Sequence, residues 1–180
     1  QNMFGGLGNL TNQDEEDESD SPDDEDDDGD DDDDGDGDGK KPSKKDNKKK
    51  NLKGAEIAYE TIITDFSDKD NKIIASKPLL SKKIYDQFNE ALKDRKNRGH
   101  FAEITFIGVN SADIKEHKKV NSILQVTVNF VGEVITCIRD KDKKIVSGNP
   151  EKIKKIYDTW IFSRDTKSQN PNWQLVETLN

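Results

Sequence analysis

The sequence predicts an α+β domain in which two N-terminal helices pack on one face of a curved, four-stranded antiparallel sheet. Before Gly99, apolar residues repeat at helical spacing. Beyond Gly99 they alternate with polar residues, which is the spacing of a strand with one buried side. Short connections between the strands favour antiparallel pairing. Helices followed by a strand meander are typical of a sheet covered by helices on one face only.

Residues 1–50 differ in composition from the rest of the chain. Nineteen of the 38 acids lie between Asp14 and Asp38, and seven lysines follow up to Lys50. Such a segment buries too little apolar surface to offset the entropy of ordering its backbone. We therefore expect 1–50 to be a disordered tether, aspartate-rich and then lysine-rich, and 51–180 to be one folded domain. That domain carries 18 acids and 22 bases, although the whole chain has a net charge of -9.

The acidic run matches a calcium-binding loop only in part. Asp34, Asp36 and Asp38 have the spacing of the first EF-hand ligands, but the twelfth position, which needs an acid, is Lys45. The single cysteine, Cys137, excludes an intramolecular disulfide and a cysteine-built zinc site. We therefore expect no metal and no cofactor.

Two amphipathic helices are expected before Gly99. The first spans residues 53–66, with one apolar stripe formed by Ala55, Tyr59, Ile62, Ile63 and Phe66. The second begins after Ser81, a residue type that caps helices by accepting a backbone hydrogen bond. It ends near Arg98 and Gly99, because glycine readily adopts the left-handed conformation that stops a helix. Its apolar residues are Ile84, Phe88, Ala91 and Leu92.

The expected strands follow Gly99. A long strand covers residues 124–139, and Gly132 in its middle indicates a bend or bulge. An earlier strand covers residues 102–109 and extends toward His117. Turn-forming residues predict turns at 118–122, 140–144, 148–150 and 170–172.

Five aromatic side chains have two interpretations, as a core or as the wall of a cavity: Phe106, Phe130, Trp160, Phe162 and Trp173. In a core, burial of each would contribute roughly 1.5–3 kcal/mol to stability. Around a cavity open at one end, they would receive an acyl chain or an apolar partner segment. The sequence leaves both interpretations open.

Positive charge is concentrated on and after the second helix, at Lys82, Lys83, Lys93, Arg95, Lys96 and Arg98. A solvated helix surface has this composition. A docking face for anionic lipid or for a protein partner is the sharper hypothesis. Nucleic acid is a less favoured partner, because the acidic tether would repel its phosphates.

Little in the sequence indicates catalysis, which needs a nucleophile with a base, or paired carboxylates, in a dry pocket. His100 and His117 lie near expected turns, and Cys137 has the parity of the solvent-facing strand residues. Asp158 and Arg164 are expected to form a structural ion pair. We therefore expect no enzyme activity.

Two motifs near the C-terminus are specific enough to indicate a family. They are residues 158–165 (DTWIFSRD) and 170–176 (NPNWQLV), supported by 78–81 (PLLS) and 106–109 (FIGV). Together they resemble the C-terminal domain of the Tim-forty-four-like domain family, which is named for a mitochondrial import-motor scaffold and includes bacterial TimA relatives. The resemblance extends over the whole folded part of the chain.

This resemblance implies a cone-like fold similar to nuclear transport factor two, with a concave sheet around an apolar cavity. It implies a non-enzymatic, membrane-associated adaptor for protein translocation or assembly at the inner membrane. Its partners would be anionic lipid, a protein such as a translocase or chaperone, or both. The alternative is a carrier of lipid or small apolar ligands that uses the cone cavity.

The resemblance also implies a location, either the cytoplasmic face of a bacterial inner membrane or the matrix face of the mitochondrial one. The mitochondrial scaffolds carry a chaperone-binding region ahead of this domain, whereas this chain has an acidic tether there. We therefore do not expect the tether to recruit a chaperone. The bacterial relatives begin with a membrane-anchoring helix. A chain that opens with Gln1 instead of methionine fits the removal of such a helix.

Overall fold

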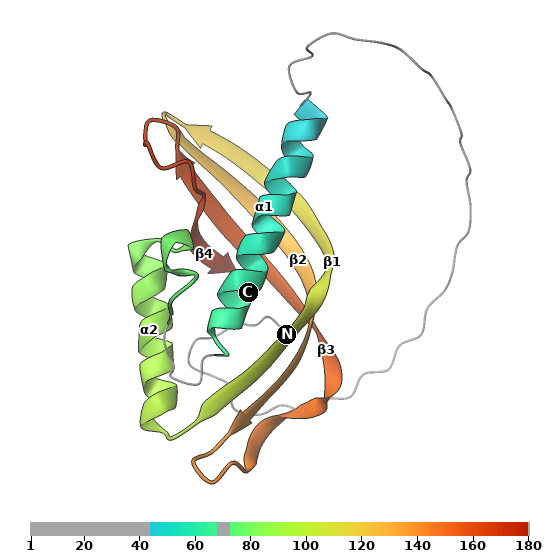
Figure 1. Ribbon diagram of the computed structural model, residues 1–180. Coiled ribbons are helices and arrows are strands. Elements are labelled where there is room, and N and C mark those ends of the chain that lie inside the picture. The colour runs from blue at the N-terminus through green and yellow to red at the C-terminus, as the bar shows by residue number, and fades with distance from the viewer. Residues whose placement is uncertain (1–43, 68–72, 180) are drawn as a thin grey trace, which may run out of the picture.

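The computed structural model of the protein describes residues 44–67 and 73–179 (Figure 1). Two helices, α1 (Lys44–Asp65) and α2 (Lys82–Asn97), are separated by a short 3-10 turn, η1 (Lys77–Leu79). The strands are β1 (Phe101–Val120), β2 (Ile123–Arg139), β3 (Ile145–Asp165) and β4 (Gln174–Leu179). They form one sheet in the order β1-β2-β3-β4, and every neighbouring pair is antiparallel.

Both helices lie on one side of the sheet, which curves around α1 (Figure 1). The hydrophobic core lies between the helices and the sheet. The helices contribute Tyr59, Ile62 and Ile63 of α1 and Phe88 and Leu92 of α2, and the strands contribute their inward-facing side chains. The expected fold class, α+β with helices on a curved four-stranded antiparallel sheet, is confirmed.

The contacts of α1 fix its direction relative to the sheet. At its C-terminal end, the Ser67 hydroxyl accepts a hydrogen bond of 2.8 Å from the backbone N–H of Ile104, near the start of β1. Two turns earlier, the Tyr59 ring lies 6.0 Å from the Phe106 ring, further along β1. The helix therefore runs opposite to β1, and its first turns lie toward the end of the sheet where β1 joins β2.

The first helix begins earlier than expected, at Lys44 instead of residue 53. Residues 44–51 contain no apolar side chain, so apolar periodicity could not predict them as helical. They contain five lysines, and lysine has a favourable helix propensity. The boundary of the tether at residue 50 was therefore wrong for these residues. The remainder of the tether, with its acidic run, lies outside the described residues and stays a prediction.

The second helix agrees with the sequence at both ends. The Ser81 hydroxyl accepts a hydrogen bond of 3.3 Å from the backbone N–H of Ile84. Beyond Asn97, Gly99 adopts a φ of 69°, the left-handed conformation expected at the end of a helix.

Strands β1 and β3 are longer than expected. The bulge expected near Gly132 is present in the partner strand, since the β1–β2 register shifts between Val109 and Ser111, opposite Gly132 and Val131. Gly132 lies within continuous β2 and gives the Tyr59 ring room to approach, because a Cβ there would lie 3.0 Å from the Tyr59 ring. The predicted turn at 148–150 was wrong, since these residues belong to β3. The turn signal reflects a real irregularity: Gly148 has a φ of 79°, and the β2–β3 register shifts between Val134 and Thr136.

Replacing Gly132 with valine should test the close packing of α1 on the sheet. The new side chain must displace the Tyr59 ring or Ile156, so we expect the free energy of unfolding to fall by about 1–3 kcal/mol in urea titration. The control is Gly108→Val, because a Cβ at Gly108 has no neighbour within 4 Å. Equal losses in the two variants would contradict this packing.

Candidate functional site

Tyr59 of α1 is the centre of the concave side of the sheet. Its ring is fully buried and stacks on Phe130 with the ring centroids 4.3 Å apart. The Trp160 ring lies 4.7 Å away and the Phe106 ring 6.0 Å away, so aromatic side chains surround it. Such contacts add to the stabilisation that burial alone provides.

The five aromatic residues singled out in the sequence fall into two groups. Phe130, Trp160 and Phe162 are buried, whereas Phe106 and Trp173 are half-buried and pack against the core. All five therefore contribute to the packed interior. On the concave side, the fully buried Tyr59, Ile62 and Ile63 of α1 occupy the space that a cone cavity would offer.

A polar contact joins α1 to the sheet within this apolar setting. The Tyr59 hydroxyl donates a hydrogen bond of 2.5 Å to Asp158 Oδ2, and Asp158 is only 3% exposed. The expected ion pair between Asp158 and Arg164 was wrong. They are six positions apart on the same strand, a span of about 20 Å, so the two side chains are out of reach of each other.

The Tyr59–Asp158 contact was missed because its partners are 99 positions apart in the sequence. One signal was present. Asp158 shares the strand parity of Trp160 and Phe162, so its carboxylate had to lie on the buried side and needed a donor there.

The buried environment suppresses ionisation of Tyr59. Burial raises its pKa far above the usual value of 10.0, and the neighbouring Asp158 charge and hydrogen bond raise it further. The raised pKa favours a neutral phenol that donates to Asp158.

The predicted basic face on helix two needs one correction. Arg95 is only 8% exposed, and its guanidinium donates a 2.7 Å hydrogen bond to the backbone oxygen of Phe66. Arg95 therefore ties α2 to the end of α1. The other five cations are exposed, but Asp86, Glu90 and Asp94 share the exposed surface. Lys82, for example, pairs with Asp86 at 2.7 Å. The surface is basic but mixed.

The candidate reactive groups are not assembled into a catalytic arrangement. Cys137 is paired with Glu103, and its sulfur lies 3.3 Å from Glu103 Oε2. It is only 2% exposed, however, so it is not the solvent-facing residue that its parity predicted. Burial and this carboxylate raise the pKa of the thiol, which disfavours the nucleophilic thiolate. His100 precedes β1 and His117 lies near its other end. Within 44–67 and 73–179, no three His, Cys, Asp or Glu side chains form a group that could hold a metal.

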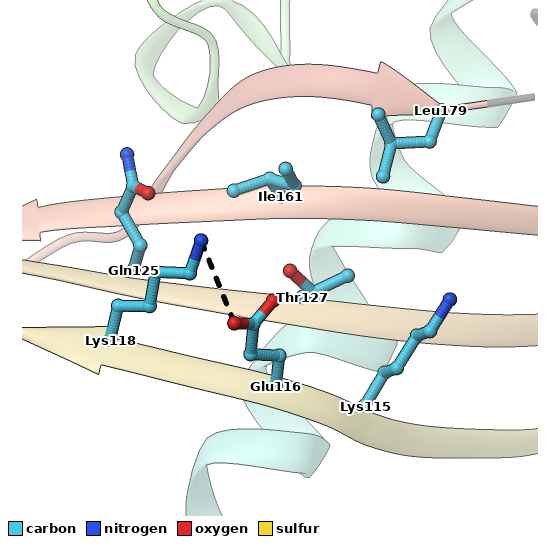
Figure 2. A pocket seen from close by; sticks show the side chains of 7 residues that line it. All are labelled: Lys115, Glu116, Lys118, Gln125, Thr127, Ile161 and Leu179. Carbon is cyan, nitrogen blue, oxygen red and sulfur yellow. Dashed lines mark ion pairs between the residues drawn. The ribbon is translucent and has the colours of Figure 1, made fainter.

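The side of the sheet opposite α1 carries two shallow grooves. Figure 2 shows the first, of about 130 Å³, with an ion pair of 3.5 Å between Lys118 and Glu116 at its centre. The second, of about 420 Å³, is lined mainly by neighbouring residues of β1, β2 and β3, including exposed Tyr157. Neither groove was predicted, because each gathers residues from separate strands.

The fold and this site define a class of protein: an α+β domain whose concave side is closed by its own first helix. The family model of the Tim44-like domain matches residues 46–180. The chain belongs to the Tim44-like family, as the C-terminal motifs indicated.

The chain has distant sequence similarity to a mitochondrial import protein. The probable mitochondrial import inner membrane translocase subunit tin-44 of Caenorhabditis elegans is 25% identical over 99 residues. Those residues are 53% of this chain and 23% of the relative, so the chain spans less than a quarter of that protein. The name of this relative connects the family with protein import at the mitochondrial inner membrane.

Among solved structures, the intermembrane space region of the chloroplast protein ARC6 has a TM-score of 0.38 and 12% identity, over 68% of this chain and 93% of that one. Within the described part of the chain, no helix combines the length and apolar character required to span a membrane.

The raised pKa of Tyr59 predicts a loss of stability at alkaline pH. The unfolded chain releases the phenol proton near pH 10, whereas the folded chain retains it. Stability is therefore fully present below that pH and falls above it, by about 1.4 kcal/mol per pH unit for this group. Urea unfolding between about pH 9 and pH 11 should give a shallower decline for Tyr59→Phe than for wild type.

The control for this measurement is Tyr157→Phe, which changes an exposed tyrosine on the other side of the sheet. It should retain the wild-type slope. An identical slope in Tyr59→Phe would show that the Tyr59 phenol does not resist ionisation in the folded state.

Proposed function

We propose that this chain is a non-enzymatic, membrane-associated adaptor domain for protein translocation or assembly at the inner membrane. One observation carries the proposal: the concave side of the sheet is filled by α1, with Tyr59 stacked on Phe130. Partners and lipids therefore meet the domain on its surface. Membership of the Tim44-like family, with a relative named as an import translocase subunit, supports the same conclusion.

The surface chemistry suits anionic partners. Lys83, Lys93 and Lys96 of α2 are exposed and can contact a phosphate-bearing lipid or an acidic protein segment. Because acids share this surface, contact with a protein that presents both charges fits α2 better than contact with a uniformly anionic polymer. Nucleic acid is for this reason a poor candidate.

The alternative function, a carrier of lipid or small apolar ligands, has less support. A ligand inside the cone would need the space taken by Tyr59, Ile62 and Ile63, all fully buried. Its entry would require α1 to leave the sheet, at the cost of the aromatic contacts and of the hydrogen bond to Asp158.

The proposed location is a membrane surface facing a reducing compartment, either the cytoplasmic face of a bacterial inner membrane or the matrix face of the mitochondrial one. The single, buried cysteine is compatible with such a compartment.

Proximity labelling of the full chain in its source cell tests the adaptor function. We expect enrichment of inner-membrane proteins, translocase subunits among them, over the same labelling enzyme attached to an unrelated soluble domain. The variant Lys83→Glu/Lys93→Glu/Lys96→Glu should reduce this enrichment severalfold, because it reverses the charge of the α2 surface. A profile without membrane proteins would contradict the adaptor function.

A further inference from the structure

The connection between β1 and β2 presents two aliphatic side chains to solvent at the end of the sheet. Val120 is 64% exposed and Ile123 is 37% exposed, and the two are directly opposite each other across the hairpin. Only Asn121 and Ser122 separate them, with Asn121 at a φ of 54°. The tip of the hairpin is therefore an apolar pair joined by a tight turn.

The tip is held in place by the neighbouring connection. The backbone oxygen of Ser122 accepts two hydrogen bonds from Thr166, one from its N–H at 2.8 Å and one from its hydroxyl at 3.0 Å. The two apolar side chains are thus presented on a supported turn, which lowers the entropy lost when they become buried in a partner.

Lysines lie next to this apolar pair on both sides of the sheet. Lys118 shares the outer side of the hairpin with Val120, as the alternation of the strand requires, and Lys119 lies on the other side. Lys115 lies further back along β1, whereas Lys167 directly follows Thr166, the residue that bonds to Ser122. Acids also lie near the tip: Glu116 pairs with Lys118, and Asp165 lies directly opposite Ile123 on β3. The first turns of α1, which begin with Lys44 and Lys45, point to the same end of the sheet.

We propose that this end of the domain, defined by Val120, Ile123, Lys118 and Lys119, docks on the surface of an anionic bilayer. The inference rests on the proposed function and names the surface that makes the membrane contact. The two aliphatic side chains enter the headgroup layer, and the lysines behind them contact lipid phosphates. A convex tip with apolar side chains ahead of cations fits a fluid lipid surface, whereas a protein partner would need a matching pocket.

The acidic run upstream of α1 opposes long-range attraction to such a surface. Charge alone therefore does not hold the domain on the bilayer, and the apolar pair is essential. Binding should depend on both contributions, so that removing either one weakens it.

The opposite end of β2 provides an internal control. The β2–β3 connection also carries lysines and exposed Ile145 and Val146, but its turn contains Asp140 and Asp142, and its two aliphatic residues are adjacent in the strand. The β2–β3 register shifts between Ile138 and Arg139, so Ile145 and Val146 do not form a cross-strand pair as Val120 and Ile123 do.

Co-sedimentation of the full chain with vesicles tests the proposal. The vesicles contain phosphatidylcholine alone or phosphatidylcholine with phosphatidylglycerol. We expect wild type to bind the anionic vesicles more strongly. Val120→Ser/Ile123→Ser and Lys118→Glu/Lys119→Glu should each weaken that binding roughly tenfold. The matched controls Ile145→Ser/Val146→Ser and Lys141→Glu/Lys144→Glu should bind as wild type does. Unchanged thermal unfolding verifies that each variant is folded.

The possible outcomes separate this inference from the proposed function. Two results would contradict the assignment of the membrane contact to the hairpin tip. In the first, the tip variants bind vesicles as well as wild type does; in the second, the control variants lose as much binding as the tip variants. Either result would mean that another part of the adaptor contacts the membrane. If wild type binds neither kind of vesicle, the proposal that the domain contacts lipid directly is wrong. An adaptor would then reach the membrane only through a protein partner.

Discussion

The structure depends on the packing of α1 into the concave side of the sheet. Tyr59 makes the central contacts of this packing: its ring stacks on Phe130, and its hydroxyl donates a hydrogen bond to the buried Asp158. A lone carboxylate in this apolar setting would be costly without a donor, so the hydrogen bond fixes the position of the helix along the strands. Gly132 permits the close approach, since any larger residue would collide with the ring.

This packing determines where the domain can bind. A sheet of this curvature would enclose a cavity if its concave side were empty, but here the chain fills that side itself. The surfaces that we propose for binding are therefore outer ones, namely the mixed-charge face of α2 and the hairpin end with Val120 and Ile123. These surfaces are the ones on which the proposed adaptor function relies.

The sequence predicted the features that depend on local chemistry. Alternation revealed β2, and the cap at Ser81 and the stop at Gly99 revealed α2. The sequence did not predict the features that depend on contacts between residues far apart along the chain. Arginine is usually a surface residue, but Arg95 is buried and its guanidinium donates a hydrogen bond to the backbone oxygen of Phe66, just after α1. The lysine-rich start of α1 has no apolar periodicity, and the exposed pair at the β1–β2 tip is visible only once the register is known.

The most direct test of the central claim, that the concave side is a packed core, is the free energy of unfolding of Trp160→Ala. Since Trp160 is fully buried against Tyr59 and Phe130, the loss should be about 3–5 kcal/mol and clearly larger than in Trp173→Ala, where the side chain is half-buried. A modest loss in Trp160→Ala, together with altered uptake of a fluorescent fatty acid, would instead identify Trp160 as the wall of a ligand cavity and contradict this account.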